Sequence, residues 1–215
     1  MAGYCTLDLA NFPVQRLVVI VANLLDAIIT TNDKLTMERV TTHFDSRAVP
    51  SITVSAYLTR ILKYAPFSNE VLLSLLVYFD RIANRHQHAF ILDSFNIHRL
   101  LISSIVIASK FWSDVFYSNS RYAKVGGLSV HEMNKLEIEF LFLCNFDLHV
   151  RLEDLQTYGN ELLAHATYQQ SLVERCIVLK KRKSPEEDHG YFHQIISVSK
   201  KAWLHDILSP GNTAH

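Results

Sequence analysis

Residues 69–84 read NEVLLSLLVYFDRIAN and have apolar side chains on almost every side of a helix. Residues 96–112, NIHRLLISSIVIASKFW, have the same character. Helices this apolar are buried on several sides by other elements. Elsewhere the apolar residues also recur at helical rather than alternating spacing, and only six glycines and five prolines interrupt them. The sequence therefore predicts an all-α protein.

Further helices are expected before and after these two in the sequence. The spacing predicts helices at residues 14–30, 53–65, 130–145 and 152–165, and a last amphipathic segment at 191–208. The clearest start signal is the capping box of Ser129 and Glu132. We expect residues 32–51 to form a loop with at most one short helix, and residues 117–128 to be irregular.

The composition favours one compact intracellular domain with helical extensions. Twenty-one basic residues balance twenty-one acidic ones, so no net field draws the chain to nucleic acid, membrane or an acidic substrate. An odd number of widely spaced cysteines is typical of reduced core residues in the nucleus or cytoplasm; here they are Cys5, Cys144 and Cys176.

The longest apolar stretch, Leu17 to Ile29, contains Asn23 and Asp26. It falls short of the roughly 20 residues that a membrane span needs, so no transmembrane helix is expected. A secretory signal is also not expected, because Asp8 lies in the region that would be basic and no small-residue cleavage site follows.

Two charged residues, Glu137 and Asp80, stand out because apolar residues surround them. At about 100° per residue, Glu137 lies inside the apolar stripe that holds Met133 and Phe140. A buried carboxylate needs a partner, which is either an internal cation or a group on another protein. Asp80 raises the same question, and Arg60 on the preceding helix is the best-placed cation for a structural salt bridge. Lys110, near a helix end, would by spacing alone be a solvated lysine.

These residues and their neighbours resemble the cyclin family. The stretches that carry the resemblance are, in chain order, Pro50-Ser51-Ile52, Tyr57 to Tyr64, Tyr78-Phe79-Asp80-Arg81, Ala108-Ser109-Lys110-Phe111, Asn119 to Gly127, Glu132 to Glu137 and Phe146-Asp147-Leu148. The segment Tyr-Ala-Lys-Val-Gly-Gly at 122–127 resembles the P/U-type branch, the cyclins of phosphate pathways.

The resemblance implies a fold and a domain plan. It implies a cyclin box of five helices over residues 50–166, an N-terminal helix and loop over 1–49, and a C-terminal helical extension over 167–215. A second box would need about a hundred residues after 165, and fifty remain. Residues 56–59 do not match the apolar substrate-docking motif of S-phase cyclins, so substrate choice stays open.

The resemblance also implies a function: a non-catalytic subunit that binds and activates a cyclin-dependent protein kinase. Lys110 and Glu137 are the implied pair that bonds to the kinase backbone, and Arg60 with Asp80 the implied internal salt bridge. Apolar kinase contacts are implied at Ile107, Phe111, Leu141, Phe146 and Leu148, and an acidic contact at Asp114. No cofactor, metal or small-molecule substrate is implied.

Other functions have less support. A DNA-binding protein of the same fold would need two boxes and a basic surface. A metal site would rest on His189 and His193, one helical turn apart and without a clear third ligand. A helical scaffold without a kinase partner also remains possible. Lys180 to Lys183 fit either a nuclear import signal or a solvated loop, and Ser184 and Ser209 each precede a proline, as in proline-directed phosphorylation sites.

Overall fold

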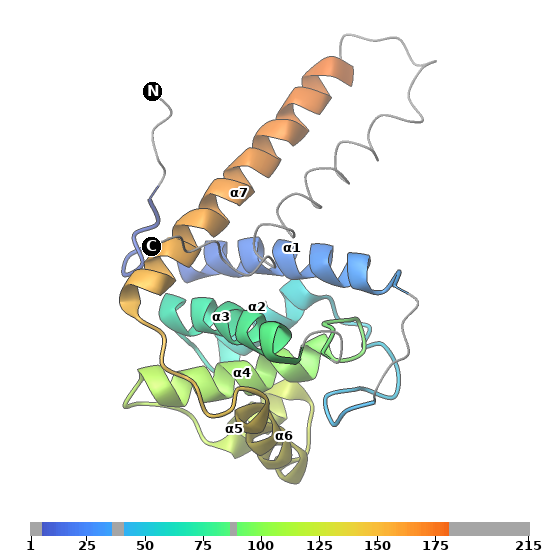
Figure 1. Ribbon diagram of the computed structural model, residues 1–215, viewed down its shortest axis with the longest axis vertical. Helices are drawn as coiled ribbons and strands as arrows, with labels where there is room; N and C mark the ends of the chain where they lie inside the picture. The colour runs from blue at the N-terminus through green and yellow to red at the C-terminus, as the bar shows by residue number, and fades with distance from the viewer. Residues whose placement is uncertain (1–5, 36–40, 87–89, 181–215) are drawn as a thin grey trace.

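The computed structural model describes residues 6–35, 41–86 and 90–180, with the backbone alone for 173–180 (Figure 1). Several predictions therefore lie outside the described residues: the helix at 191–208, the histidine pair His189 and His193, the serines Ser184 and Ser209, and Cys5. The side chains of Cys176 and of Lys180 to Lys183 also lie outside them.

Within the described ranges the chain forms seven α-helices and no strand. They are α1 (Val14–Asn32), α2 (Val54–Tyr64), α3 (Asn69–His86), α4 (Ile97–Trp112), α5 (Asn119–Gly126), α6 (Val130–Leu143) and α7 (Leu152–Lys180). The predicted all-α class is confirmed. Helices α3 and α4 pack against each other at the centre of the bundle, and most of their residues are buried, as their all-round apolar character requires.

Helix α1 is longer than the apolar run in the sequence suggests. It has 19 residues and is long and apolar enough, by length and composition, to cross a membrane. The helix extends three residues beyond the apolar run Leu17 to Ile29 at each end, and core helices of soluble proteins pass the same test of length and composition. Its apolar side packs against α2, α3 and α7, with seven residues buried in the core: Leu17, Val18, Val21, Ala22, Leu24, Leu25 and Ile29.

Helix α5 corrects the prediction that residues 117–128 are irregular. Ser118 caps its start by accepting a hydrogen bond from the backbone N–H of Arg121. Gly127 ends it with φ of 73°, a left-handed conformation that glycine adopts without strain. Eight residues give a weak periodic signal, and tertiary packing of the buried Tyr122 stabilises the helix.

Helix α7 is slightly more than twice as long as predicted and leaves the bundle beyond its first turns (Figure 1). The packed part of α7 holds the N-terminal segment, residues 6–13. Gln156 Nε2 donates to the Leu7 carbonyl at 2.5 Å, and the Leu7 N–H donates to Asn160 Oδ1 at 2.8 Å. A side chain at Gly159 would meet Leu7 at 3.2 Å, so this glycine leaves room for the segment.

Candidate functional site

Helices α4 and α6 bring the two predicted partner-binding charges together. Lys110 Nζ, in the last turn of α4, lies 2.5 Å from Glu137 Oε1 on α6. The lysine side chain is 30% exposed and the carboxylate side chain 17% exposed. The apolar stripe of α6 therefore contains a carboxylate because an internal cation balances it. Both groups still reach the surface.

The second oxygen of Glu137 is also occupied. Asn119, the first residue of α5, donates from Nδ2 to Glu137 Oε2 at 2.6 Å and to Asn134 Oδ1 at 2.8 Å. Three helices thus fix the position of one carboxylate. A side chain held this way loses little conformational entropy when a partner binds to it.

Exposed aromatic and aliphatic side chains occur on the elements that carry this ion pair. Phe111 follows Lys110 directly and is half-exposed, and Phe142 and Phe146 are 63% and 59% exposed, with their ring centroids 5.4 Å apart. Further exposed apolar residues are Val115 and Phe116, in the segment between α4 and α5, and Ile138 on α6. We call these six residues the exposed apolar surface. Large exposed apolar patches mark interaction sites in soluble proteins.

Sequence reasoning identified Phe111 and Phe146 but missed Phe142 and Ile138. A signal for them existed. Ile138 and Phe142 lie one turn apart on α6, outside the stripe that contains the buried Met133 and Phe140. An apolar residue outside the buried stripe of an amphipathic helix has no core to pack against.

The remaining predicted contact residues differ in exposure. Ile107 is only 3% exposed and lies in the core, so in this conformation it cannot touch a partner. Leu141 and Leu148 are partly buried and pack against the core. Asp114 is exposed in the segment between α4 and α5.

The segment after α6 carries Phe146 in an unusual backbone conformation. Asn145 and Phe146 have φ of 51° and 58°, the left-handed region that costs energy for residues other than glycine. The Phe146 N–H donates to the Leu141 carbonyl at 2.9 Å, as in a Schellman helix end. We call residues 144–151 the α6–α7 segment.

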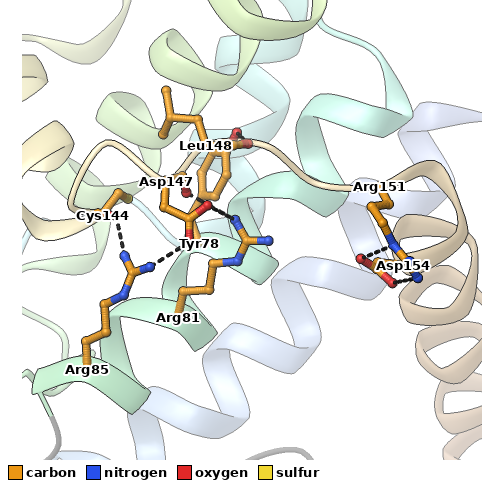
Figure 2. A network of polar contacts seen from close by, with 8 residues as sticks. All are labelled: Tyr78, Arg81, Arg85, Cys144, Asp147, Leu148, Arg151 and Asp154. Carbon is orange, nitrogen blue, oxygen red and sulfur yellow. Dashed lines mark hydrogen bonds and ion pairs between the residues drawn. The ribbon is translucent and has the colours of Figure 1, made fainter.

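Two arginines of α3 hold this segment (Figure 2). Arg85 Nη2 lies 2.6 Å from Asp147 Oδ2, and Arg85 Nη1 donates to the Cys144 carbonyl. Arg81 Nη1 donates to the Asp147 carbonyl at 3.1 Å, and Tyr78 donates its hydroxyl to the Leu148 carbonyl at 3.0 Å. These bonds offset the strain of the left-handed residues and fix where the Phe146 ring lies.

The predicted Arg60–Asp80 salt bridge is not formed in the described part of the chain. Arg60 is exposed, whereas Asp80 Oδ2 accepts a hydrogen bond from the Tyr158 hydroxyl of α7 at 2.7 Å. Burial raises the pKa of the Asp80 carboxyl, and the Tyr158 hydrogen bond lowers it. A neutral hydroxyl donor from a distant helix therefore satisfies Asp80 in place of the expected cation.

A comparison with protein families decides what kind of molecule carries this surface. The family model described as cyclin matches residues 15–148, more than half of the chain. The chain belongs to the cyclin family. The match spans α1 to α6, including the Lys110–Glu137 pair and the start of the α6–α7 segment.

Relatives of this cyclin confirm the P/U-type branch. PHO85 cyclin-7 of Saccharomyces cerevisiae is 46% identical over 179 residues, 73% of this chain and 63% of that protein. PHO85 cyclin-like protein psl1 of Schizosaccharomyces pombe is 55% identical over 121 residues, 56% of this chain and 50% of its own length. Cyclin-U4-1 of Arabidopsis thaliana is 38% identical over 162 residues, 74% of this chain and 80% of its own. The matched region thus spans less than two thirds of the two yeast relatives.

Proposed function

We propose that this cyclin is a regulatory subunit that binds and activates a cyclin-dependent protein kinase and contributes no catalytic group itself. The observation that carries the proposal is the Lys110–Glu137 pair, partly exposed on two helices that also carry exposed apolar side chains. Apolar contacts supply the area of an interface, and a few fixed polar groups supply its register. The names of the yeast relatives make PHO85 the first kinase to test.

Binding of this kind would act by shifting a kinase population. A protein kinase is active only when its catalytic lysine pairs with the glutamate of its regulatory helix. A partner that converts a mostly inactive population into a mostly active one must prefer the active state by about 5.5 kcal/mol. That preference calls for a broad interface of roughly 2,000 Å². The exposed apolar surface provides its central part.

The internal ion pair suggests how recognition begins. Lys110 and Glu137 are already partly removed from water and fixed by each other and by Asn119. When kinase backbone groups approach, each charge can accept a new partner without first losing a full hydration shell. In the free subunit the same pair neutralises both charges.

Charge reversal at Glu137 tests the proposal. We expect Glu137→Lys to abolish kinase binding and activation, because Lys110 then faces a like charge. The double variant K110E/E137K restores the internal attraction, so its melting temperature should return towards the wild-type value while activation stays at least tenfold reduced. The measurement is kinase activity of the purified complex, together with thermal melting of the subunit alone.

Glu139→Lys is the matched control, because Glu139 lies about 160° around α6 from Glu137. The Glu139 carboxylate oxygen Oε1 lies 3.5 Å from His43 Nε2. The control makes the same charge change on the same helix and should activate the kinase normally. Normal activation by a folded Glu137→Lys protein would contradict the proposal. If no kinase co-purifies with the wild type, the chain is instead a helical scaffold.

We further propose that the kinase is the main partner, that no metal, cofactor, membrane or nucleic acid takes part, and that the protein works in the nucleus or cytoplasm. The zero net charge supports the exclusion of nucleic acid. Burial raises the pKa of the Cys144 thiol to about 12, which keeps it protonated and unreactive at neutral pH. Imaging of a fluorescent fusion, and metal analysis of untagged protein, test these points.

A further inference from the structure

Four exposed cations gather on a face formed by α2 and α5. Arg60 and Lys63 lie one turn apart on α2, and Arg121 and Lys124 lie one turn apart on α5. Among the residues that the structure describes, no carboxylate forms an ion pair with any of them. We call these four residues the basic face. It stands out in a chain whose total charge is zero.

Contacts between the two helices place the four cations close together. The Tyr57 hydroxyl, early in α2, donates to the Gly126 carbonyl at the end of α5 at 3.5 Å. Arg121 Nε, early in α5, donates to the carbonyl of Tyr64 at the end of α2 at 2.7 Å. The helices therefore run antiparallel. This arrangement puts Arg60 level with Lys124, and Lys63 level with the start of α5.

Arg121 is fixed in a way that a merely solvated arginine is not. Its guanidinium carbon lies 4.0 Å from the centre of the Tyr117 ring, so the two groups stack. Its Nε satisfies the last carbonyl of α2, one of the groups that a helix end leaves without a partner. In the described part of the chain, neither Nη1 nor Nη2 makes a hydrogen bond. The two amino groups thus form a fixed fork of N–H donors that have no acceptor among the described residues.

We propose that the basic face binds a phosphorylated serine or threonine of a partner protein. A phosphate carries a charge between −1.5 and −2 at pH 7 and three strong acceptor oxygens. The Arg121 fork suits two of those oxygens, because guanidinium binds phosphate through two parallel hydrogen bonds. Lys63, Lys124 and Arg60 then neutralise the rest of the charge. A single carboxylate would leave most of this positive charge unbalanced.

The basic face shares no residue with the kinase contact proposed above. It lies on α2 and α5, whereas Lys110, Glu137 and Phe142 lie on α4 and α6. The two surfaces adjoin at the start of α5, where Asn119 donates to Glu137 two residues before Arg121. The basic face would let the subunit select proteins that already carry a phosphate, and its test needs the cyclin alone, independent of kinase activation.

The test measures binding of the peptide acetyl-Gly-phosphoserine-Pro-Gly-amide to the full chain by nitrogen-15 NMR. The Arg121 Nε–H is observable because its hydrogen bond slows exchange with water. We expect its signal to shift with added phosphopeptide, and the unphosphorylated peptide to cause no shift. The dissociation constant should rise with added salt, because the contact is between charges.

Substitutions at Arg121 then distinguish recognition by the fixed guanidinium from attraction to positive charge in general. Arg121→Gln should weaken phosphopeptide binding by about tenfold or more, the loss expected for hydrogen bonds to a charged group. Arg121→Lys keeps the charge but loses the fork, so it should bind almost as weakly. Arg16→Gln, which removes an exposed arginine from α1, is the control and should bind like the wild type. Thermal melting checks that each variant is folded.

Several results would overturn the proposal. Wild-type affinity in Arg121→Lys would show that the held guanidinium is not the recognition group. Equal binding of a tetraglutamate peptide would show a surface for acidic chains rather than for phosphate. Tighter binding of a short DNA duplex than of the phosphopeptide would make the face a nucleic-acid contact.

Discussion

His98 is a buried histidine whose environment suits the neutral ring. Its Nε2 lies 2.9 Å from the Ile52 carbonyl, and its ring packs edge to face against Tyr57 at 5.0 Å. Its Nδ1 is buried and has no hydrogen-bond partner among the described residues. Burial lowers the pKa of His98, and the hydrogen bond to the Ile52 carbonyl and the nearby carboxyl of Asp26 only partly oppose this. The folded protein therefore takes up this proton at a lower pH than the unfolded chain.

This difference gives stability a defined pH dependence. Below the ordinary histidine pKa of about 6.5, the unfolded state binds more protons at this site than the folded state does. We expect the free energy of unfolding to fall as the pH drops from 7 to 5. In His98→Gln, which keeps a donor for the Ile52 carbonyl but does not titrate, the fall should be smaller. Urea unfolding at a series of pH values measures the free energy of unfolding of the wild type and of His98→Gln. If this free energy changes equally with pH in the two proteins, His98 is not the cause.

Single residues also show where sequence reasoning succeeds. The helical position of Glu137 among apolar neighbours correctly predicted that its carboxylate needs a partner, which Lys110 supplies. The same argument correctly showed that Asp80 needs a partner, but it chose Arg60 on the adjacent helix. The actual donor, Tyr158, is 78 residues away on α7. No local pattern predicts which of two distant side chains fills such a position.

At the scale of elements, the long, strongly periodic helices were predictable and the short or strained ones were not. The stripes of α2, α3, α4 and α6 are visible in the sequence, as is the Ser129 cap, whose Oγ accepts from the Glu132 N–H at 3.1 Å. Helix α5 depends on tertiary packing of Tyr122. The left-handed residues after α6 depend on arginines of α3, which sequence spacing does not connect to them.

Those arginines give a prediction about the α6–α7 segment. Arg85→Met removes the guanidinium that holds Asp147 and the Cys144 carbonyl but keeps an apolar stem. We expect faster amide hydrogen exchange at residues 144–148 and kinase affinity reduced by several-fold, because Phe146 is no longer fixed. Stability should fall by only about 1 kcal/mol, since the pair is partly exposed.

Arg151→Met is the control for this change (Figure 2). Arg151 pairs with Asp154 three residues later, and both side chains are largely exposed. Removing that pair should leave the exchange at 144–148 and the kinase affinity unchanged. If Arg85→Met behaves the same way, the α6–α7 segment does not depend on α3 for its conformation.

At the scale of the whole molecule, segments far apart in the sequence close the fold. The N-terminal segment packs Leu7 and Leu9 into the core, and Asn69 at the start of α3 donates to the carbonyls of Leu9 and Phe12 at 2.9 and 2.7 Å. Leu7 also touches Gly159 of α7. Sequence analysis gave residues 1–13 no structural role, because a short irregular segment has no periodicity to detect.

We expect Leu7→Ala to destabilise the protein substantially. Leu7 is 2% exposed, and truncation of a buried leucine costs about 2 to 5 kcal/mol in transfer and cavity terms. Leu35→Ala, at a leucine that is 53% exposed, should change stability by less than about 0.5 kcal/mol. Urea unfolding gives the free energy of unfolding of the Leu7→Ala and Leu35→Ala proteins. Equal, small losses would mean that the N-terminal segment is not part of the cooperative unit.

The N-terminal segment also sets how far the chain can be shortened. The family match runs from residue 15 to residue 148, so a protein trimmed to those limits would lose both Leu7 and the α7 surface that receives it. Leu73 would face water, and the Asn69 amide would lose both of its acceptors. The smallest piece that folds by itself should therefore begin near residue 6 and reach at least into the packed turns of α7. Expression of nested truncations, ranked by soluble yield, would locate both limits.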